Sequence, residues 1–256
     1  MKTLVLDCDG VLYLGDVSVP GAGQVLKALD AAGHQLLFVT NNATKTPAGI
    51  AEKIRAVVGY DAEPDQVIGS AVAAASMLEA RDEPVFVFGE GGLRSAVEAR
   101  GFETTNDWRK ARAVVVGLNR SVTYELVSDA ASAVRGGARF VAANTDSTYP
   151  TPDGLLPGAG TWVAAIAVAS GREPEVAGKP HRPTVDLVAS RAQSQDVWVV
   201  GDRAETDLAM AEQAGWKSVL VLTGVGTRES RLPSGAVPDL ILDTVADLLD
   251  AVSEAS

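Results

Sequence analysis

Two carboxylates near the start of the chain have the spacing that nucleophilic chemistry requires. Asp7 and Asp9 follow the apolar run LVL, with Cys8 between them and Gly10 after them. Side chains in an extended strand alternate between its faces, so we expect both acids on one face and Cys8 packed in the core on the other. Two like charges at the end of a buried strand are costly unless a cation or another partner compensates them. A strand end that is merely exposed to water would carry the same two acids. Whether Asp7 and Asp9 are functional residues therefore depends on the other candidate residues of the chain.

Two later apolar runs also end in polar residues. The run LLFVT is followed by two asparagines, the run VWVV by the segment GDRAETD, and a Gly-Lys-Pro loop lies between them in the chain. Ligands of open parallel sheets bind outside the carboxyl ends of the strands, so we expect these residues to converge with the first pair. The additional candidates are Thr40, Asn41, Asn42, Lys179, Asp202 and Asp207.

These residue types match the requirements of phosphoryl transfer, which are an in-line nucleophile, neutralised phosphoryl oxygens and a proton for the leaving oxygen. An ionised Asp7 can attack phosphorus and form an aspartyl-phosphate, while a protonated Asp9 serves as general acid and base, so their pKa values must be split. Thr40 and nearby N–H groups can hold the phosphoryl oxygens, and Lys179 can offset developing negative charge. Several carboxylates suit Mg²⁺, and the single cysteine and two histidines form no zinc-type cluster.

The elements that must position these residues alternate between strand-like and helix-like segments, as in parallel sheets with helical crossovers. A polar, proline-bearing break at 81–84 divides the pattern. Before it and in the last third of the chain, strands are predicted at 4–8, 34–40, 197–200 and 218–222, with helices at 23–32, from 46 onward, and at 70–80, 183–191, 205–213 and 243–252. Just after the break, strands are predicted at 85–88, 113–116 and 139–142, helices at 91–100, 123–135 and 161–170, and a long irregular loop at 144–160. The sequence therefore predicts two α/β units.

Composition narrows the functional classes. The chain of 256 residues is 46% hydrophobic and 21% charged, which predicts a sizeable core and no extensive disorder. Its net charge of −11 argues against nucleic-acid binding, which generally shows a basic footprint. One cysteine permits no intrachain disulfide, and the first apolar run is too short for a signal peptide. We expect a soluble cytoplasmic protein with no nucleic-acid or membrane partner.

Four motifs in this order resemble the haloacid dehalogenase superfamily of phosphatases. They are DCDGVLYLG at 7–15, FVTNN at 38–42, GKP at 178–180 and GDRAETD at 201–207. The long gap between the second and third motifs, with AANTD at 142–146 and LLPGAGT at 155–161, is similar to the subgroup with a large inserted α/β cap (C2-type, subfamily IIA). That subgroup includes 4-nitrophenyl, phosphoglycolate, glycerol-phosphate and pyridoxal phosphate phosphatases and the nucleotide phosphatase of the N-acetylglucosamine operon.

The resemblance implies a Rossmann-like core at 1–82 and 174–256 and a cap that determines substrate specificity at 83–173. It implies that Asp7 is the nucleophile and a Mg²⁺ ligand, and that Asp9 is the acid/base and a ligand through its backbone carbonyl. Asp202 would be a direct metal ligand, and Asp207 would support the metal site. Phosphoryl binding is implied for Thr40, Asn41 and Asn42, and a bridge from nucleophile to phosphate for Lys179. Glu205, where many members have Asp, is a small departure. The ion-pumping branch of the superfamily carries Thr at the position of Asp9, so Asp there implies a hydrolase that turns over.

Substrate specificity is expected from the cap loop, where the resemblance places Asp146, Tyr149 and Asp153 over the active site. Pyridoxal phosphate phosphatase has a histidine at the position of Tyr149, so a pyridoxal-type contact is disfavoured here. His181 follows the Lys179 loop closely and is a further candidate for contact with the leaving group. A loop that packs only on its own cap is the alternative for each of these residues.

The leading hypothesis is a Mg²⁺-dependent phosphatase for monoesters of small metabolites, of the phosphoglycolate, glycerol-phosphate, 4-nitrophenyl phosphate or nucleotide type. A phosphotransferase or phosphomutase would use the same aspartyl-phosphate but pass it to an acceptor other than water. A signalling receiver also uses Asp, Thr, Lys and Mg²⁺, but the second acid and the cap argue against it. A catalytically silent binding protein is disfavoured because every member of the catalytic set is present. Assembly into homo-oligomers is left open.

Overall fold

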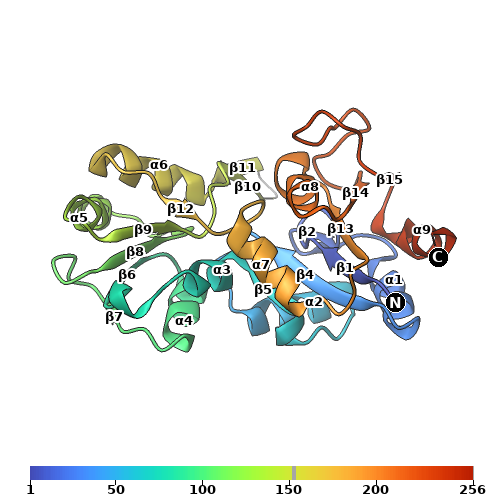
Figure 1. Ribbon diagram of the computed structural model, residues 1–256, viewed down its shortest axis with the longest axis horizontal. Helices are drawn as coiled ribbons and strands as arrows, with labels where there is room; N and C mark the ends of the chain where they lie inside the picture. Colours follow the sequence, from blue (N-terminus) through green and yellow to red (C-terminus); the bar gives the residue numbers. More distant parts are fainter. Residues whose placement is uncertain (152–153, 256) are drawn as a thin grey trace. The chain divides into compact units, whose positions relative to one another are not determined.

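The computed structural model describes residues 1–151 and 154–255, which form two compact units (Figure 1). The core unit comprises Met1–Thr40, Pro47–Ile68 and Val185–Ser256, and the cap unit comprises Asn41–Thr46 and Gly69–Thr184. The α/β class is confirmed in both. The functional borders predicted from the sequence, at 82/83 and 173/174, stay a prediction.

A six-stranded sheet forms the centre of the core unit. Its strands lie in the order β15 (Leu240–Leu242), β14 (Lys217–Val221), β13 (Val197–Gly201), β1 (Thr3–Leu6), β4 (Gln35–Thr40) and β5 (Val67–Gly69). β1 pairs in parallel with β13 on one side and with β4 on the other, so that Leu6 is level with Val200 and Phe38. The segments that follow these three strands therefore leave the sheet at the same edge.

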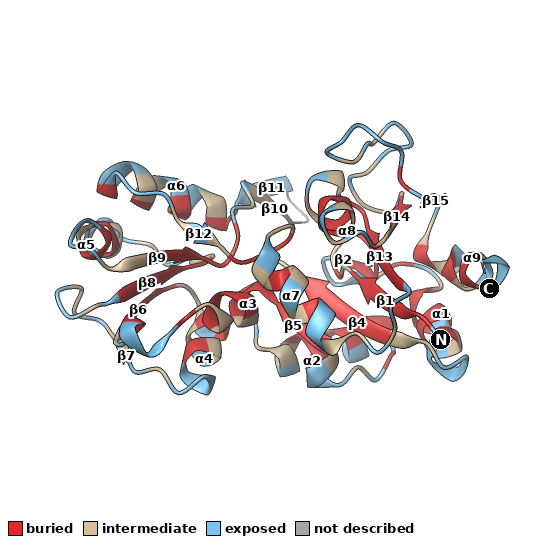
Figure 2. Ribbon diagram, in the orientation of Figure 1, coloured by how far each residue is buried: buried red, intermediate tan, exposed pale blue. Residues whose placement is uncertain are grey.

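Both faces of this sheet are buried, as Figure 2 shows by the red of its strands. On one face Leu4, Leu6 and Trp198 pack with apolar residues of three helices, α1 (Ala22–Ala31), α2 (Pro47–Val58) and α9 (Leu248–Glu254). On the other face Val5 and Val199 pack with residues of α7 (Arg182–Arg191) and α8 (Ala209–Ala214). Continuous aliphatic runs are typical of parallel strands that are covered on both faces.

A second parallel sheet forms the centre of the cap unit, in the order β12 (Glu175–Val176), β9 (Arg139–Ala142), β8 (Ala113–Val116), β6 (Val85–Phe88) and β7 (Thr104–Thr105). Two helices, α5 (Tyr124–Arg135) and α6 (Ala159–Ser170), pack together on one face of it through residues such as Val134 and Ile166. The helices α3 (Ser70–Ser76) and α4 (Gly91–Ala99) pack against each other on the other side of the same sheet (Figure 1).

The structure corrects several predicted elements. β1 ends at Leu6, because the Cys8 carbonyl accepts hydrogen bonds from the N–H groups of Leu12 and Tyr13 and turns the chain. The alternation of a regular strand therefore does not extend from Asp7 to residue 9. The predicted irregular loop contains a hairpin of β10 (Thr148–Thr151) and β11 (Gly154–Pro157), and the predicted helix at 205–213 begins as a π-helix, Ala204–Leu208. Short elements were missed, namely β5, β7, β12, β15 and the hairpin of β2 (Tyr13–Leu14) and β3 (Val17–Ser18).

Cys8 is fully buried in the core, as predicted for a packed thiol. Asp153 lies outside the described residues. Within the described ranges, no helix has both the length and the apolar character needed to cross a bilayer.

Arg139 joins three segments at one edge of the cap sheet. Its guanidinium forms two 2.8 Å hydrogen bonds with the Glu175 carboxylate, and its Nη1 donates to the Met77 carbonyl at 2.7 Å and to Asp82 Oδ2 at 2.9 Å. The Asp82 side chain is only 5% exposed, so it depends on this cation for compensation. Hydrogen bonds with Glu175 raise the pKa of Arg139, which keeps it charged.

We expect Arg139→Ala to lower the free energy of unfolding by about 2 kcal/mol, because it leaves a buried carboxylate without its cation. Urea denaturation measures this change. The matched control is Arg81→Ala, which removes an exposed pair with Glu79 and should change stability by less than about 1 kcal/mol. Equal effects of the two variants would show that the Arg139 network contributes no more than a surface pair.

Candidate active site

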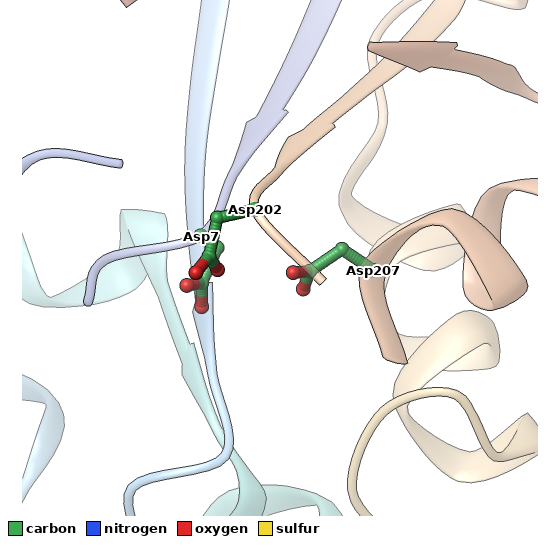
Figure 3. Close-up of side chains that lie close together, drawn as sticks. All are labelled: Asp7, Asp202 and Asp207. Carbon is green, nitrogen blue, oxygen red and sulfur yellow. The ribbon is translucent and has the colours of Figure 1, made fainter. Parts of the chain in front are cut away.

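Three carboxylates meet at the carboxyl edge of the core sheet (Figure 3). Asp7 directly follows β1, Asp202 directly follows β13, and Asp207 lies in the π-helix that comes next. One carboxylate oxygen of each lies within 4.8 Å of the others. Asp202 is 2% exposed and Asp207 is 1% exposed, so two of the three charges are held almost out of water.

Backbone groups fix the orientation of the two buried acids. The Val225 N–H donates to Asp202 Oδ2 at 2.9 Å, and the Arg203 N–H donates to Asp207 Oδ2 at 3.1 Å. Asp7 continues the sheet ladder, since its N–H donates to the Val200 carbonyl at 2.9 Å. The bonds to Asp202 and Asp207 hold their carboxylate groups in place, and the bond of Asp7 holds its backbone in line with β13.

Glycines make room for this arrangement. A Cβ at Gly224 would lie 1.9 Å from Asp202 Oδ2, and one at Gly201 would lie 2.1 Å from the Asp207 Cβ. Gly10 has a φ of +89°, and its Cβ would lie 2.5 Å from Asp202 Oδ2. The glycines are therefore required by close approach, and at Gly10 also by backbone conformation.

The three acids fit a hard divalent cation. Carboxylate oxygens are the ligands that Mg²⁺ and Ca²⁺ take, and the group contains no histidine or cysteine that would favour zinc. Asp7, Asp202 and Asp207 are the residues that would hold the ion.

Asp9 is not among the three acids of this group. It forms an isolated bridge with Tyr13, and the carbonyl of the next residue, Gly10, accepts a hydrogen bond from the Thr223 hydroxyl at 2.5 Å. Burial, followed by the nearby Cys8, Asp9 and Asp7, raises the pKa of Tyr13, so the phenol stays neutral beside these acids. The Asp9 carboxylate is not a member of the three-acid group, which leaves its predicted acid/base role and backbone ligation as predictions.

The phosphoryl-binding candidates fall into both units. Thr40 is the last residue of β4, 5% exposed, in the core unit. Asn41, Asn42 and Lys179 belong to the cap unit, and Lys179 is likewise 5% exposed. The roles predicted for these residues stay predictions.

Asn41 connects the loop after β4 with two distant segments of the cap unit. Its Nδ2 donates to Asp146 Oδ1 at 3.0 Å and to the Lys179 carbonyl at 3.2 Å. Its own carbonyl accepts from the Ser70 hydroxyl at 2.5 Å and from Asn144 Nδ2 at 2.7 Å. These hydrogen bonds hold Asn41 against Asp146, a contact that sequence reasoning did not predict.

The loop that carries Lys179 is packed tightly at Gly178. A Cβ there would lie 2.5 Å from Asn41 Oδ1, a buried atom with no hydrogen-bond partner among the described residues. The ring of His181, a predicted contact for the leaving group, lies against the Gly178 carbonyl, with its Nδ1 at 3.0 Å. Tyr149 lies in β10 of the cap hairpin.

Sequence reasoning also missed the turn after β14. It supplies the Val225 N–H and the close approach of Gly224 to Asp202. The signal was the glycine-rich segment TGVG directly after an apolar strand, where a strand-end loop is a normal place for a ligand.

Comparison with known proteins gives the family. Residues 4–103 match the family model of haloacid dehalogenase-like hydrolases, and residues 176–248 match the related HAD-hydrolase-like model. The acid sugar phosphatase of Staphylococcus haemolyticus is 36% identical over 99% of this chain and 96% of its own length.

Two solved structures extend the match to the whole fold. A p-nitrophenyl phosphatase from Archaeoglobus fulgidus is 32% identical, with a TM-score of 0.87 over 97% of this chain and 98% of its own. A glycerol phosphate phosphatase from Mycobacterium tuberculosis, in complex with magnesium, is 35% identical, with a TM-score of 0.88 over 96% of this chain and 75% of its own. The chain therefore belongs to the haloacid dehalogenase-like hydrolases, in the group of the 4-nitrophenyl phosphatases, and is a phosphatase of that family.

Proposed function

We propose that the protein is a Mg²⁺-dependent phosphatase that hydrolyses phosphate monoesters of small metabolites through an aspartyl-phosphate on Asp7. The observation that carries this proposal is the group of three carboxylates at the ends of β1 and β13, with Asp7 at the end of a rigid central strand. The small size of the substrates is supported by the relatives, which are an acid sugar phosphatase, a glycerol phosphate phosphatase and a p-nitrophenyl phosphatase.

In the proposed reaction an Asp7 oxygen attacks phosphorus, and the bond from phosphorus to the leaving oxygen breaks. Asp9 gives its proton to that oxygen, and then takes a proton from the water that attacks the aspartyl-phosphate. This second attack releases phosphate and restores the Asp7 carboxylate. Thr40 holds the phosphoryl oxygens and Lys179 offsets their charge. A bound Mg²⁺ would supply positive charge that lets Asp7 and the phosphoryl group approach each other.

The substrate class depends on residues other than the catalytic ones. The proposed catalytic residues recognise only the phosphoryl group, so discrimination among leaving groups must come from other residues. We propose sugar-type or polyol-type phosphates as substrates, with p-nitrophenyl phosphate as an artificial one. A cytoplasmic location is proposed on the single cysteine, which lies buried in the core and can form no intrachain disulfide.

Asp7→Asn is expected to lower kcat for p-nitrophenyl phosphate about a thousandfold or more, because an amide is a poor nucleophile. The assay is release of phosphate with Mg²⁺, paired with mass spectrometry of the quenched wild-type enzyme to find one phosphoryl group on the peptide that contains Asp7. Asp250→Asn, an exposed acid of α9, is the matched control and should keep full activity. Wild-type turnover by Asp7→Asn would rule out the proposed nucleophile. Added glycerol or sugar acceptors should give no new phosphate ester, whereas a phosphotransferase would form one.

Gly224→Ala is expected to weaken activation by Mg²⁺ about tenfold or more, because the new Cβ would displace the Asp202 carboxylate from its position. The measurement is the Mg²⁺ concentration that gives half-maximal phosphate release, with chelator as the metal-free baseline. Gly91→Ala is the control, since its Cβ would meet nothing within 4 Å. Activity that survives chelation would contradict the metal requirement itself, and equal Mg²⁺ dependence of both variants would contradict the role of Asp202.

A further inference from the structure

A tight loop follows Asp7, and Tyr13 closes it around Asp9. The Tyr13 carbonyl accepts a hydrogen bond from the Gly10 N–H at 2.8 Å, and the Tyr13 N–H donates to the Cys8 carbonyl at 3.3 Å. Cys8 and Gly10 are the two neighbours of Asp9 in the chain, and Asp9 itself forms the isolated bridge with Tyr13. The position of the Asp9 backbone is therefore set by that of Tyr13.

Tyr13 also begins the hairpin of β2 and β3, whose two faces differ. The strands pair so that Tyr13 is level with Ser18 and Leu14 is level with Val17. Tyr13 is 3% exposed and packs in the same apolar cluster as β1, whereas Leu14 is 53% exposed and Val17 is 71% exposed. Because residues that face each other across a hairpin share one of its faces, the hairpin rests on the core unit through Tyr13.

A cation from α2 covers the Tyr13 ring. Lys53 Nζ lies 4.0 Å from the centroid of this ring. A second contact joins Lys53 Nζ to Asp16 Oδ1, in the turn of the same hairpin, at 3.8 Å. The Lys53 side chain is 18% exposed, while that of Asp16 is 95% exposed. Since an ion pair with a fully solvated carboxylate contributes little, the aromatic face is the partner that compensates Lys53 for its partial burial.

Lys53 joins the hairpin to an element that the core holds in place. α2 packs in the apolar cluster of the core sheet through Ile50 and Ile54, on either side of Lys53 in the chain. A line of contacts therefore runs from α2 through the Lys53 ammonium group and the Tyr13 ring to both backbone neighbours of Asp9. Every member of this line belongs to the core unit.

We propose that Lys53 is a positioning residue for the acid/base Asp9, which it holds in place through the ring of Tyr13. This inference rests on the proposed function. A carboxyl group gives its proton to a leaving oxygen only within hydrogen-bond reach, so a small displacement of the loop slows proton transfer. Lys53 takes no part in the proposed binding of the phosphoryl group. Its removal should therefore impair the step that needs a proton more than it impairs binding.

The test uses two aryl esters of similar shape whose leaving groups need the proton to different extents. The nitro group stabilises p-nitrophenolate, so this anion leaves with little help from an acid, whereas the more basic phenolate of phenyl phosphate needs more. kcat/KM covers the steps up to departure of the leaving group. We expect Lys53→Met to lower kcat/KM for phenyl phosphate about fivefold or more, and that for p-nitrophenyl phosphate about twofold or less.

Lys217→Met is the matched control, because Lys217 Nζ lies 4.2 Å from the centroid of another ring, that of Trp198. This variant should keep the wild-type ratio of the two kcat/KM values. Asp16→Asn, which removes only the exposed pair, should keep it as well. Lys53→Arg retains a cation for the ring and should stay within about twofold of the wild-type ratio. Lys53→Gln, whose polar end suits partial exposure, should change the ratio in the same direction as Lys53→Met.

Equal losses on the two esters in Lys53→Met and Lys53→Gln would show that Lys53 supports only the fold, and would overturn the inference. A change of ratio in Asp16→Asn as large as that in Lys53→Met would also overturn it, because the exposed ion pair and not the ring would then be the important contact. If the wild-type enzyme released phosphate from neither ester, the proposed function would fail, and this inference with it.

Discussion

Mutual repulsion among Asp7, Asp202 and Asp207 is the constraint on which the core unit depends. Three carboxylates within 4.8 Å, two of them almost out of water, repel one another strongly in a medium of low dielectric constant. Their positions hold because the backbone N–H groups of Val225 and Arg203 bind them and because glycines allow the chain to approach. A bound cation would remove the remaining repulsion, so the same arrangement that costs stability creates affinity for a divalent ion.

The parallel sheet supplies the rigidity that this arrangement needs. β1 lies between β13 and β4, and all three are buried on both faces, so the positions of their carboxyl ends are fixed by packing with helices on either side. Since core packing resists displacement, the carboxylates cannot relax apart by more than small shifts. The functional groups stand at the ends of the most constrained strands, and the less regular loops between them complete the site.

Sequence patterns predicted those features that depend on local residues. The apolar strands Val85–Phe88, Ala113–Val116 and Arg139–Ala142 have the predicted limits, and Pro47 begins a helix as expected, because aliphatic runs and capping residues act over a few positions. The hairpin after Asn144 was missed because glycine and proline predict loops, and β5 because three residues give little periodic signal. The predicted acids Asp7, Asp202 and Asp207 do come together, yet the bond from Asn41 to Asp146 and the pair of Glu90 with Arg120 join residues far apart in sequence, which no local pattern records.

Stability gives only a weak reason for the Glu90–Arg120 pair. The Arg120 side chain is 58% exposed and that of Glu90 is 24% exposed, and ion pairs near the surface typically stabilise a fold by about 0 to 1 kcal/mol. By contrast, Arg139 compensates a carboxylate that is 5% exposed, so its network has a clear structural role at the opposite end of the same strands. The two arginines of the cap unit thus differ in what they do. Arg139 holds segments together at the amino edge of the cap sheet, whereas Arg120 remains partly exposed to solvent at its carboxyl edge.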